Sequence, residues 1–184
     1  MYNEALKQLK IGNEYYVTHN CNPAVFDNAK RRELTEHGQK PYAIIVTCGD
    51  SRVPAEHLFS AGLGDLFVIR NAGNVISPID IGSAEYAAEH LGTSLLVVLG
   101  HTHCGAVAAT LEGDGESYIR SITDEIKEAI QEEKDPRKCE WLNAKNSVKK
   151  LLQSPILSHL KETNKLNILA GMYDIESGRV VFED

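Results

Sequence analysis

Two short apolar runs constrain the fold of this chain more than any other feature. Residues 42–47 read Tyr-Ala-Ile-Ile-Val-Thr and residues 94–99 read Ser-Leu-Leu-Val-Val-Leu, each followed by glycine and polar residues. Such runs are typical of central strands of a parallel sheet, which are buried on both faces. We therefore predict an α/β fold with a mainly parallel central sheet of about four strands plus a C-terminal antiparallel strand, flanked by helices.

The other expected elements follow from hydrophobic periodicity, capping residues and breakers. We expect one domain over residues 1–184, with an N-terminal helical arm over about 1–37. The expected helices span 2–18, 23–34, 54–59, 80–91 and 106–113, an irregular loop spans 71–74, and 116–162 is polar and helical in tendency. Further strands are expected at 66–70, 166–173 and 179–182, the last two forming a hairpin.

Charge and hydropathy exclude some classes of partner. The chain has 19 Lys and Arg against 26 Asp and Glu, a net charge of −7, which disfavours nucleic acid and anionic membranes as partners. No apolar run is long enough to span a membrane, and the first residues lack the apolar core of a signal peptide. We expect a cytoplasmic protein.

The strand ends carry soft metal ligands. Cys48 follows the first apolar run, and His101 and Cys104 follow the second. Because carboxyl ends of parallel strands meet at one edge of a sheet, these three residues should converge. Thiolates and imidazoles are preferred zinc ligands, so we predict one Zn²⁺ per chain. Cys21 and Cys139 have no ligand partner at suitable spacing and are interpreted as ordinary thiols.

Ligand count alone does not separate a catalytic zinc from a structural one. Three protein ligands leave the fourth position open for water, as in catalytic sites. His103, His57 or Asp50 could instead close the site. Arg52 favours the catalytic interpretation, because a bidentate pair with Arg52 would keep Asp50 off the metal and leave it to orient water.

The pattern Cys48-x-Asp50-Ser51-Arg52 with His101-x-x-Cys104 resembles the signature of the β-class carbonic anhydrases. The resemblance covers about residues 38–105, while 113–162 carries little family signal. It implies reversible hydration of CO2 to bicarbonate and a proton, by zinc hydroxide that the Asp–Arg dyad orients. It also implies a homodimer whose N-terminal helices pack on the partner, with dimers often pairing into tetramers.

The same resemblance assigns further positions. Gln39 matches a glutamine that contacts substrate across the dimer, and Phe67 and Tyr86 match the aromatic walls of the CO2 pocket. Small residues on the substrate side are Ala72, Gly73 and Gly105. His90 resembles a proton-relay position. His90 could equally be an ordinary helix histidine, and Phe67 could equally be a simple core residue. In the subtype whose aspartate swings onto zinc, a Trp stands where this chain has Ile45, so Asp50 is expected to stay on Arg52.

Three alternatives remain open at this point. The same fold could hydrolyse another linear cumulated substrate, such as carbon disulfide or carbonyl sulfide. A non-catalytic structural zinc module would have a closed, four-ligand metal. A redox dithiol formed by Cys48 and Cys104 is weaker, since neither lies in a Cys-x-x-Cys motif.

Overall fold

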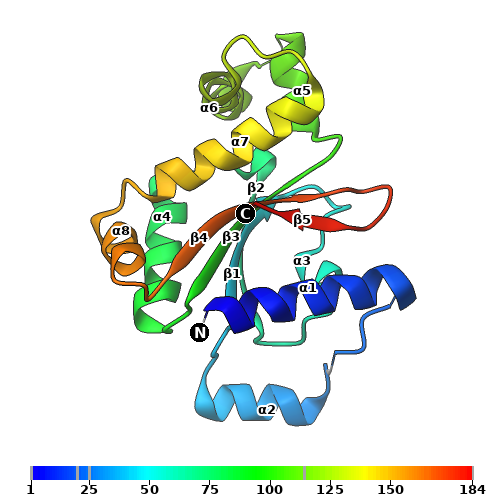
Figure 1. Ribbon diagram of the computed structural model, residues 1–184, viewed down its shortest axis with the longest axis vertical. Helices are drawn as coiled ribbons and strands as arrows, with labels where there is room; N and C mark the ends of the chain where they lie inside the picture. The colour runs from blue at the N-terminus through cyan, green and yellow to red at the C-terminus, as the bar shows by residue number, and fades with distance from the viewer. Residues whose placement is uncertain (1, 20, 25, 114, 184) are drawn as a thin grey trace.

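Five strands form one sheet at the centre of the molecule (Figure 1). The computed structural model describes residues 2–19, 21–24, 26–113 and 115–183. The sheet has the order β2-β1-β3-β4-β5. The strands are β1 (Ala43–Cys48), β2 (Leu66–Asn71), β3 (Leu95–His101), β4 (Asn167–Tyr173) and β5 (Val180–Phe182). The first four are parallel and β5 is antiparallel to β4, which confirms the predicted sheet.

Helices connect the strands and cover both faces of the sheet. The α-helices are α1 (Tyr2–His19), α2 (Asn28–His37), α3 (Ala55–Leu58), α4 (Pro78–Glu85), α5 (Gly105–Glu112), α6 (Arg120–Ile130), α7 (Pro136–Leu151) and α8 (Pro155–Glu162). Three further short helical segments are η1 (Ala72–Asn74), the π-helical η2 (Tyr86–His90) and η3 (Ser117–Ile119). Connections between parallel strands require such crossovers, so the alternation of strand and helix follows from the parallel sheet.

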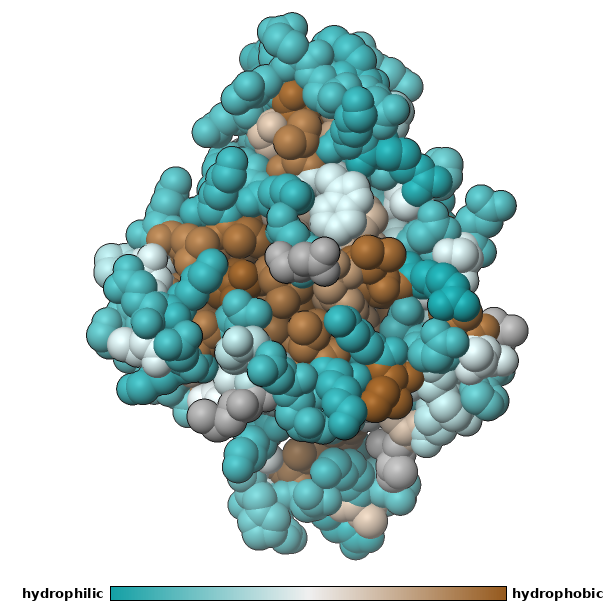
Figure 2. Space-filling view, in the orientation of Figure 1, coloured by the Kyte–Doolittle hydropathy of each residue, from teal (hydrophilic) through white to brown (hydrophobic). Residues whose placement is uncertain are grey.

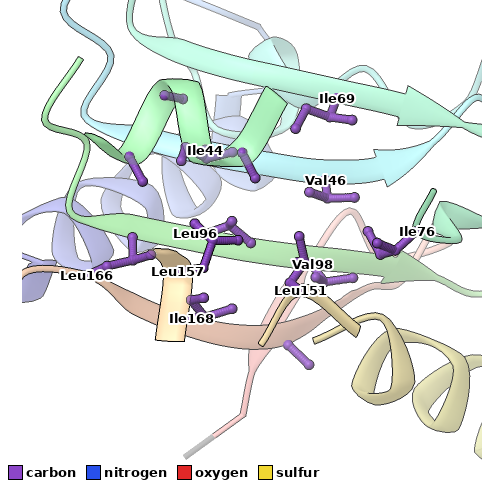
Figure 3. Close-up of a cluster of buried hydrophobic side chains, with 14 of the residues drawn as sticks. Ile44, Val46, Ile69, Ile76, Leu96, Val98, Leu151, Leu157, Leu166 and Ile168 are labelled. Atoms are coloured by element: carbon purple, nitrogen blue, oxygen red, sulfur yellow. The ribbon is translucent and has the colours of Figure 1, made fainter. Parts of the chain in front are cut away.

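One face of the sheet packs against α4, α7 and α8. Alternate residues of the central strands point to this face, since successive side chains of a strand point to opposite sides. Figure 3 shows Ile44 and Val46 of β1 beside Leu96 and Val98 of β3, with Leu151 of α7 among the labelled neighbours. Burial of these side chains drives the packing of the three helices.

The opposite face packs against α1 and α3, which gives three layers. Leu9 of α1 is fully buried in this second cluster, with Ile45 and Val97 from the sheet. The Asn13 amide also fixes α1 in place. Asn13 Nδ2 donates to the carbonyls of Leu58 at 3.1 Å and Gly178 at 2.9 Å, and its Oδ1 accepts the N–H of Val180 at 2.9 Å.

The N-terminal arm differs in part from the expectation. The second helix was expected over 23–34, but α2 begins at Asn28, because Asp27 accepts the Lys30 N–H at 2.8 Å and caps the helix. None of the α2 residues is buried. α1 packs on the sheet of its own chain, so packing of this arm on a partner stays a prediction.

A second boundary also differs from the expectation. The helix expected over 80–91 begins at Pro78, because Ser77 and Asp80 form a capping box. It ends in the π-helical turn η2.

One face of the surface has an apolar centre surrounded by hydrophilic residues. Figure 2 shows hydrophobic residues gathered in the middle of this face, over the region that Figure 1 gives to β4 and its flanking helices. No helix among the described residues is long and apolar enough to cross a membrane.

Candidate metal centre

Three metal-ligating side chains converge at the carboxyl edge of the sheet. Cys48 is the last residue of β1, His101 is the last residue of β3, and Cys104 is the N-cap of α5. β1 and β3 are adjacent and parallel, which brings their ends together. The two sulfurs and one ring nitrogen of His101 all lie within 4.8 Å of one another, and all three residues are buried. The predicted ligand set therefore forms one cluster.

The His101 ring is oriented to present a free nitrogen. Its Nδ1–H donates to the Thr102 carbonyl at 3.0 Å, which leaves a lone pair on Nε2. Nε2 is buried and has no hydrogen-bond partner among the described residues. A buried polar atom without a partner is rare in proteins, and metal coordination would satisfy it. Two sulfurs and this nitrogen fit zinc, which favours such a donor set.

Of the two neighbouring cysteines, Cys48 carries the negative charge and Cys104 stabilises it. The Cys104 thiol stabilises the Cys48 thiolate and lowers the pKa of Cys48 to about 4, with a further contribution from the backbone N–H of Gly73. That N–H donates to Cys48 Sγ at 3.3 Å. The proximity of Cys48 raises the pKa of Cys104 in turn. Cys48 is therefore a thiolate near neutral pH, the form in which cysteine binds metals.

Asp50 is held by Arg52 beside the cluster. Asp50 Oδ1 accepts hydrogen bonds from the Arg52 backbone N–H at 2.9 Å and from Nε at 3.0 Å, and Oδ2 accepts one from Nη2 at 2.7 Å. These bonds hold the pKa of Asp50 at about 2, so the carboxylate is ionised at neutral pH. Arg52 Nη2 also donates to the His103 carbonyl at 3.0 Å, which ties the pair to the second ligand loop.

None of the proposed fourth ligands joins the cluster. Among the described residues, the group of metal-ligating atoms contains Cys48, His101 and Cys104 alone. His57 and His103 are exposed, and Asp50 is occupied by Arg52. The donor set is therefore open, as in sites that admit water or substrate.

Three small residues lie next to the cluster or to its ligands, and their place in a substrate pocket stays a prediction. Gly73 contacts Cys48 Sγ through its backbone and adopts a left-handed conformation, with φ of 75° and ψ of 11°. Ala72 precedes it in η1, and Gly105 follows Cys104 directly at the start of α5. A cleft of about 590 Å³ opens beside Cys104, between α5 and the start of α7.

Four other expected site residues lie away from the cluster of their own chain. Phe67 pairs with Ile44, four residues before the Asn71 that pairs with Cys48, so it lies about 13 Å back along the strand at about 3.3 Å per residue. Tyr86 packs near Phe67 with ring centroids 6.3 Å apart, and His90 lies 5.6 Å from Tyr86. The exposed Gln39 precedes β1. Within one chain Phe67, Tyr86 and His90 form a separate group.

Buried polar residues of α7 contact the metal-centre loops, and no motif pointed to them. Glu140 Oε1 accepts the Cys104 N–H at 3.2 Å, and burial raises the pKa of Glu140. Asn143 Nδ2 donates to the Gly73 carbonyl at 2.7 Å. The available signal was the spacing of polar residues on one face of a helix, inside a segment interpreted as polar and helical in tendency.

Comparison with known proteins agrees with this geometry. The profile of the carbonic anhydrase family matches residues 43–180. A carbonic anhydrase of Mycolicibacterium smegmatis is 45% identical over 132 residues, which cover 68% of this chain and 63% of the relative. The match to this relative thus spans less than two thirds of its length.

Solved structures agree as well. A β-carbonic anhydrase of Aspergillus fumigatus superposes with a TM-score of 0.76 at 26% identity, covering 100% of this chain and 90% of that one. One of two tetrameric β-carbonic anhydrases of Sordaria macrospora gives a TM-score of 0.73 at 26% identity, covering 98% and 95%. The family match over most of the chain and the parallel sheet with its Cys-His-Cys cluster lead to one conclusion: this chain belongs to the β-class carbonic anhydrase family.

Proposed function

We propose that the protein catalyses the zinc-dependent, reversible hydration of CO2 to bicarbonate and a proton. The observation that carries the proposal is the open three-ligand cluster beside an ionised carboxylate that is bonded to arginine. A structural zinc would need a fourth protein ligand, and no described residue supplies one. Membership of the family supports the same reaction.

The metal would be held by three atoms: Sγ of Cys48, Sγ of Cys104 and Nε2 of His101. When bound, zinc supplies a Lewis acid that lowers the pKa of water from about 15.7 toward about 7. The residues around the cluster then determine how water and substrate are oriented. The N–H of Gly73 donates to Cys48 Sγ and so fixes the position of one sulfur.

Asp50 is the residue that we assign to orient the attacking water. Its carboxylate is ionised and can accept a hydrogen bond from that water, which turns an oxygen lone pair toward the carbon of CO2. Arg52 keeps the carboxylate in this position through two side-chain hydrogen bonds. Arg70 also fixes the loop that follows Cys48. It donates hydrogen bonds to the carbonyls of Cys48 at 3.0 Å and Asp50 at 2.8 Å.

A second copy of the chain would complete the substrate pocket. Gln39, Phe67 and Tyr86 lie away from the cluster of their own chain, so they can reach a metal centre only in a partner. Tyr86 is 48% exposed, although it is a large aromatic residue, which fits burial against a copy. We therefore propose a homodimer, or a tetramer of two dimers, with His90 as a proton relay at the shared pocket. Sedimentation equilibrium measures the assembly directly.

Stopped-flow CO2 hydration from about pH 6.5 to 9 tests the activity. We would compare the wild type with Asp50→Asn, which keeps the shape of the side chain and removes its charge, and measure zinc in both. Fast hydration by the wild type, with a large loss in the variant at unchanged zinc content, would support the reaction and the role of Asp50.

The contrary outcomes separate the remaining alternatives. Full zinc occupancy without CO2 hydration would overturn the proposed reaction, and activity on carbon disulfide or carbonyl sulfide would then identify a hydrolase. Equal hydration rates for the wild type and Asp50→Asn would refute the role assigned to Asp50 but not the proposed reaction. A zinc-free protein whose Cys48 and Cys104 cycle between thiol and disulfide would instead identify the redox dithiol.

A further inference from the structure

One face of α7 carries three buried polar side chains. Glu140, Asn143 and Ser147 are 4%, 2% and 2% exposed. Their spacing of three and four residues places them on the same side of the helix. Buried polar groups are costly unless they are hydrogen-bonded, so a stripe of three on one helix needs partners across the interface. All three partners are backbone groups in the loops that form the metal centre.

Glu140 contacts the loop of the second and third ligands. Its Oε1 accepts the backbone N–H of Cys104 at 3.2 Å. Cys104 is the N-cap of α5 and makes no capping bond through its own side chain, which stays free for the metal. The preceding His103 has a positive φ of 58°, a strained conformation for a residue with a side chain. Glu140 thus holds a strained turn at the point where a ligand emerges.

Asn143 and Ser147 contact the loop that supports the first ligand. Asn143 Nδ2 donates to the Gly73 carbonyl at 2.7 Å, and Ser147 Oγ donates to the Asn74 carbonyl at 2.8 Å. The Gly73 N–H in turn donates to Cys48 Sγ at 3.3 Å. Asn143 therefore fixes the peptide group between Gly73 and Asn74. It thereby also fixes Gly73, whose N–H donates to Cys48 Sγ.

The same helix packs closely against the strand that carries His101. A Cβ placed on Gly100 would lie 3.3 Å from the Ala144 Cβ and 3.5 Å from the Glu140 carbonyl oxygen. The absence of a side chain at Gly100 allows this approach of α7 to β3. One helix therefore contacts the strand that carries His101, the turn that carries Cys104 and the Gly73 loop whose N–H donates to Cys48.

We propose that this face of α7 positions the metal ligands, with Glu140 as the positioning residue for Cys104 and Asn143 as the positioning residue for Cys48. The inference rests on the proposed metal centre but concerns residues outside its signature motifs. Outer partners of metal ligands fix ligand orientation, and their removal typically lowers metal affinity about 10- to 100-fold. Glu140 acts here as a hydrogen-bond acceptor, which an amide oxygen can replace.

The test compares matched variants of α7. Glu140→Ala removes the acceptor, whereas Glu140→Gln retains an oxygen at the same place. Leu151→Ala serves as the control, because Leu151 is buried in the same helix and packs in the apolar cluster that holds Ile44 and Leu96. Zinc affinity is measured by competition with a chromophoric chelator, below the unfolding transition of every variant. The cobalt-substituted proteins report thiolate geometry through their sulfur-to-cobalt absorption bands.

We expect Glu140→Ala to lose about 10- to 100-fold in zinc affinity and to change the cobalt bands, with Glu140→Gln close to the wild type. Asn143→Ala should change the cobalt bands as well, and Leu151→Ala should lower thermal stability without changing either readout. Hydrogen exchange of the Cys104 amide should accelerate in metal-free Glu140→Ala.

Two results would overturn the inference. Wild-type zinc affinity and unchanged cobalt bands in both Glu140→Ala and Asn143→Ala would show that the stripe does not position the ligands. An equal loss in Leu151→Ala would show that only the stability of α7 matters. A wild type that binds zinc tightly but fails to hydrate CO2 would refute the proposed function without affecting these measurements.

Discussion

Substituting Gly73 by alanine tests how tightly the loop beside Cys48 is packed. Gly73 has φ of 75°, and a Cβ there would lie 3.0 Å from both the Ala106 Cβ and the Ile126 Cδ1. A left-handed conformation costs an alanine about 1–2 kcal/mol. Overpacking of a close-packed interior adds about 1–3 kcal/mol. We therefore expect Gly73→Ala to lower the free energy of unfolding by about 2–5 kcal/mol, the sum of the two contributions.

Gly113 provides the matched control. It caps α5 with φ of 83°, and no atom lies within 4 Å of a Cβ built on it. Gly113→Ala should therefore show the conformational contribution alone, about 1–2 kcal/mol. Urea unfolding of both metal-free variants, monitored by circular dichroism, gives the two values. If Gly73→Ala were no more destabilising than Gly113→Ala, the packing argument for this loop would be refuted.

Three further substitutions follow from the same geometry. Arg52→Ala should release Asp50 and reduce kcat for CO2 hydration by roughly 10- to 100-fold at unchanged zinc content, because a charged hydrogen bond contributes about 1.5–3 kcal/mol. Equal stopped-flow rates for the wild type and this variant would contradict the role of the Asp50–Arg52 pair. Ser77→Ala removes the cap of α4 and should lower the unfolding free energy by about 1 kcal/mol in urea titration. Leu9→Ala should lower it by about 2–5 kcal/mol, since Leu9 is fully buried against the sheet; a near-neutral effect in calorimetry would place α1 outside the core.

Sequence patterns predicted the sheet and the ligand cluster well because both depend on local signals. β1 and β3 are buried at every position, and such strands appear in a sequence as unbroken apolar runs. Parallel strands that end at the same edge then bring Cys48 and His101 together without further information. The Asp50–Arg52 pair could also be predicted, because a single residue separates the two partners in a short loop.

Features that depend on contacts between distant segments could not be predicted in this way. Glu140 lies 36 residues after Cys104 in the chain, inside a segment interpreted only as polar and helical in tendency. The predicted start of the second helix was wrong, because the prediction took Pro23 as the helix start and overlooked the side-chain cap at Asp27. Phe67 was assigned to the substrate pocket through family resemblance, and its distance from the cluster depends on strand register.

The amide of Asn13 has a consequence for how the chain folds during synthesis. It joins the first helix to the Leu58 carbonyl and to the hairpin that contains Val180, a separation of 167 residues. During synthesis, α1 can bury Leu9 and bond to the Leu58 carbonyl once the central strands exist, but Gly178 and Val180 become available only with the C-terminal hairpin. α1 is therefore synthesised before the sheet on which it packs but fully bonded only once β5 exists, and a nascent chain that stalls before residue 178 would hold it by apolar contacts and the Leu58 carbonyl alone.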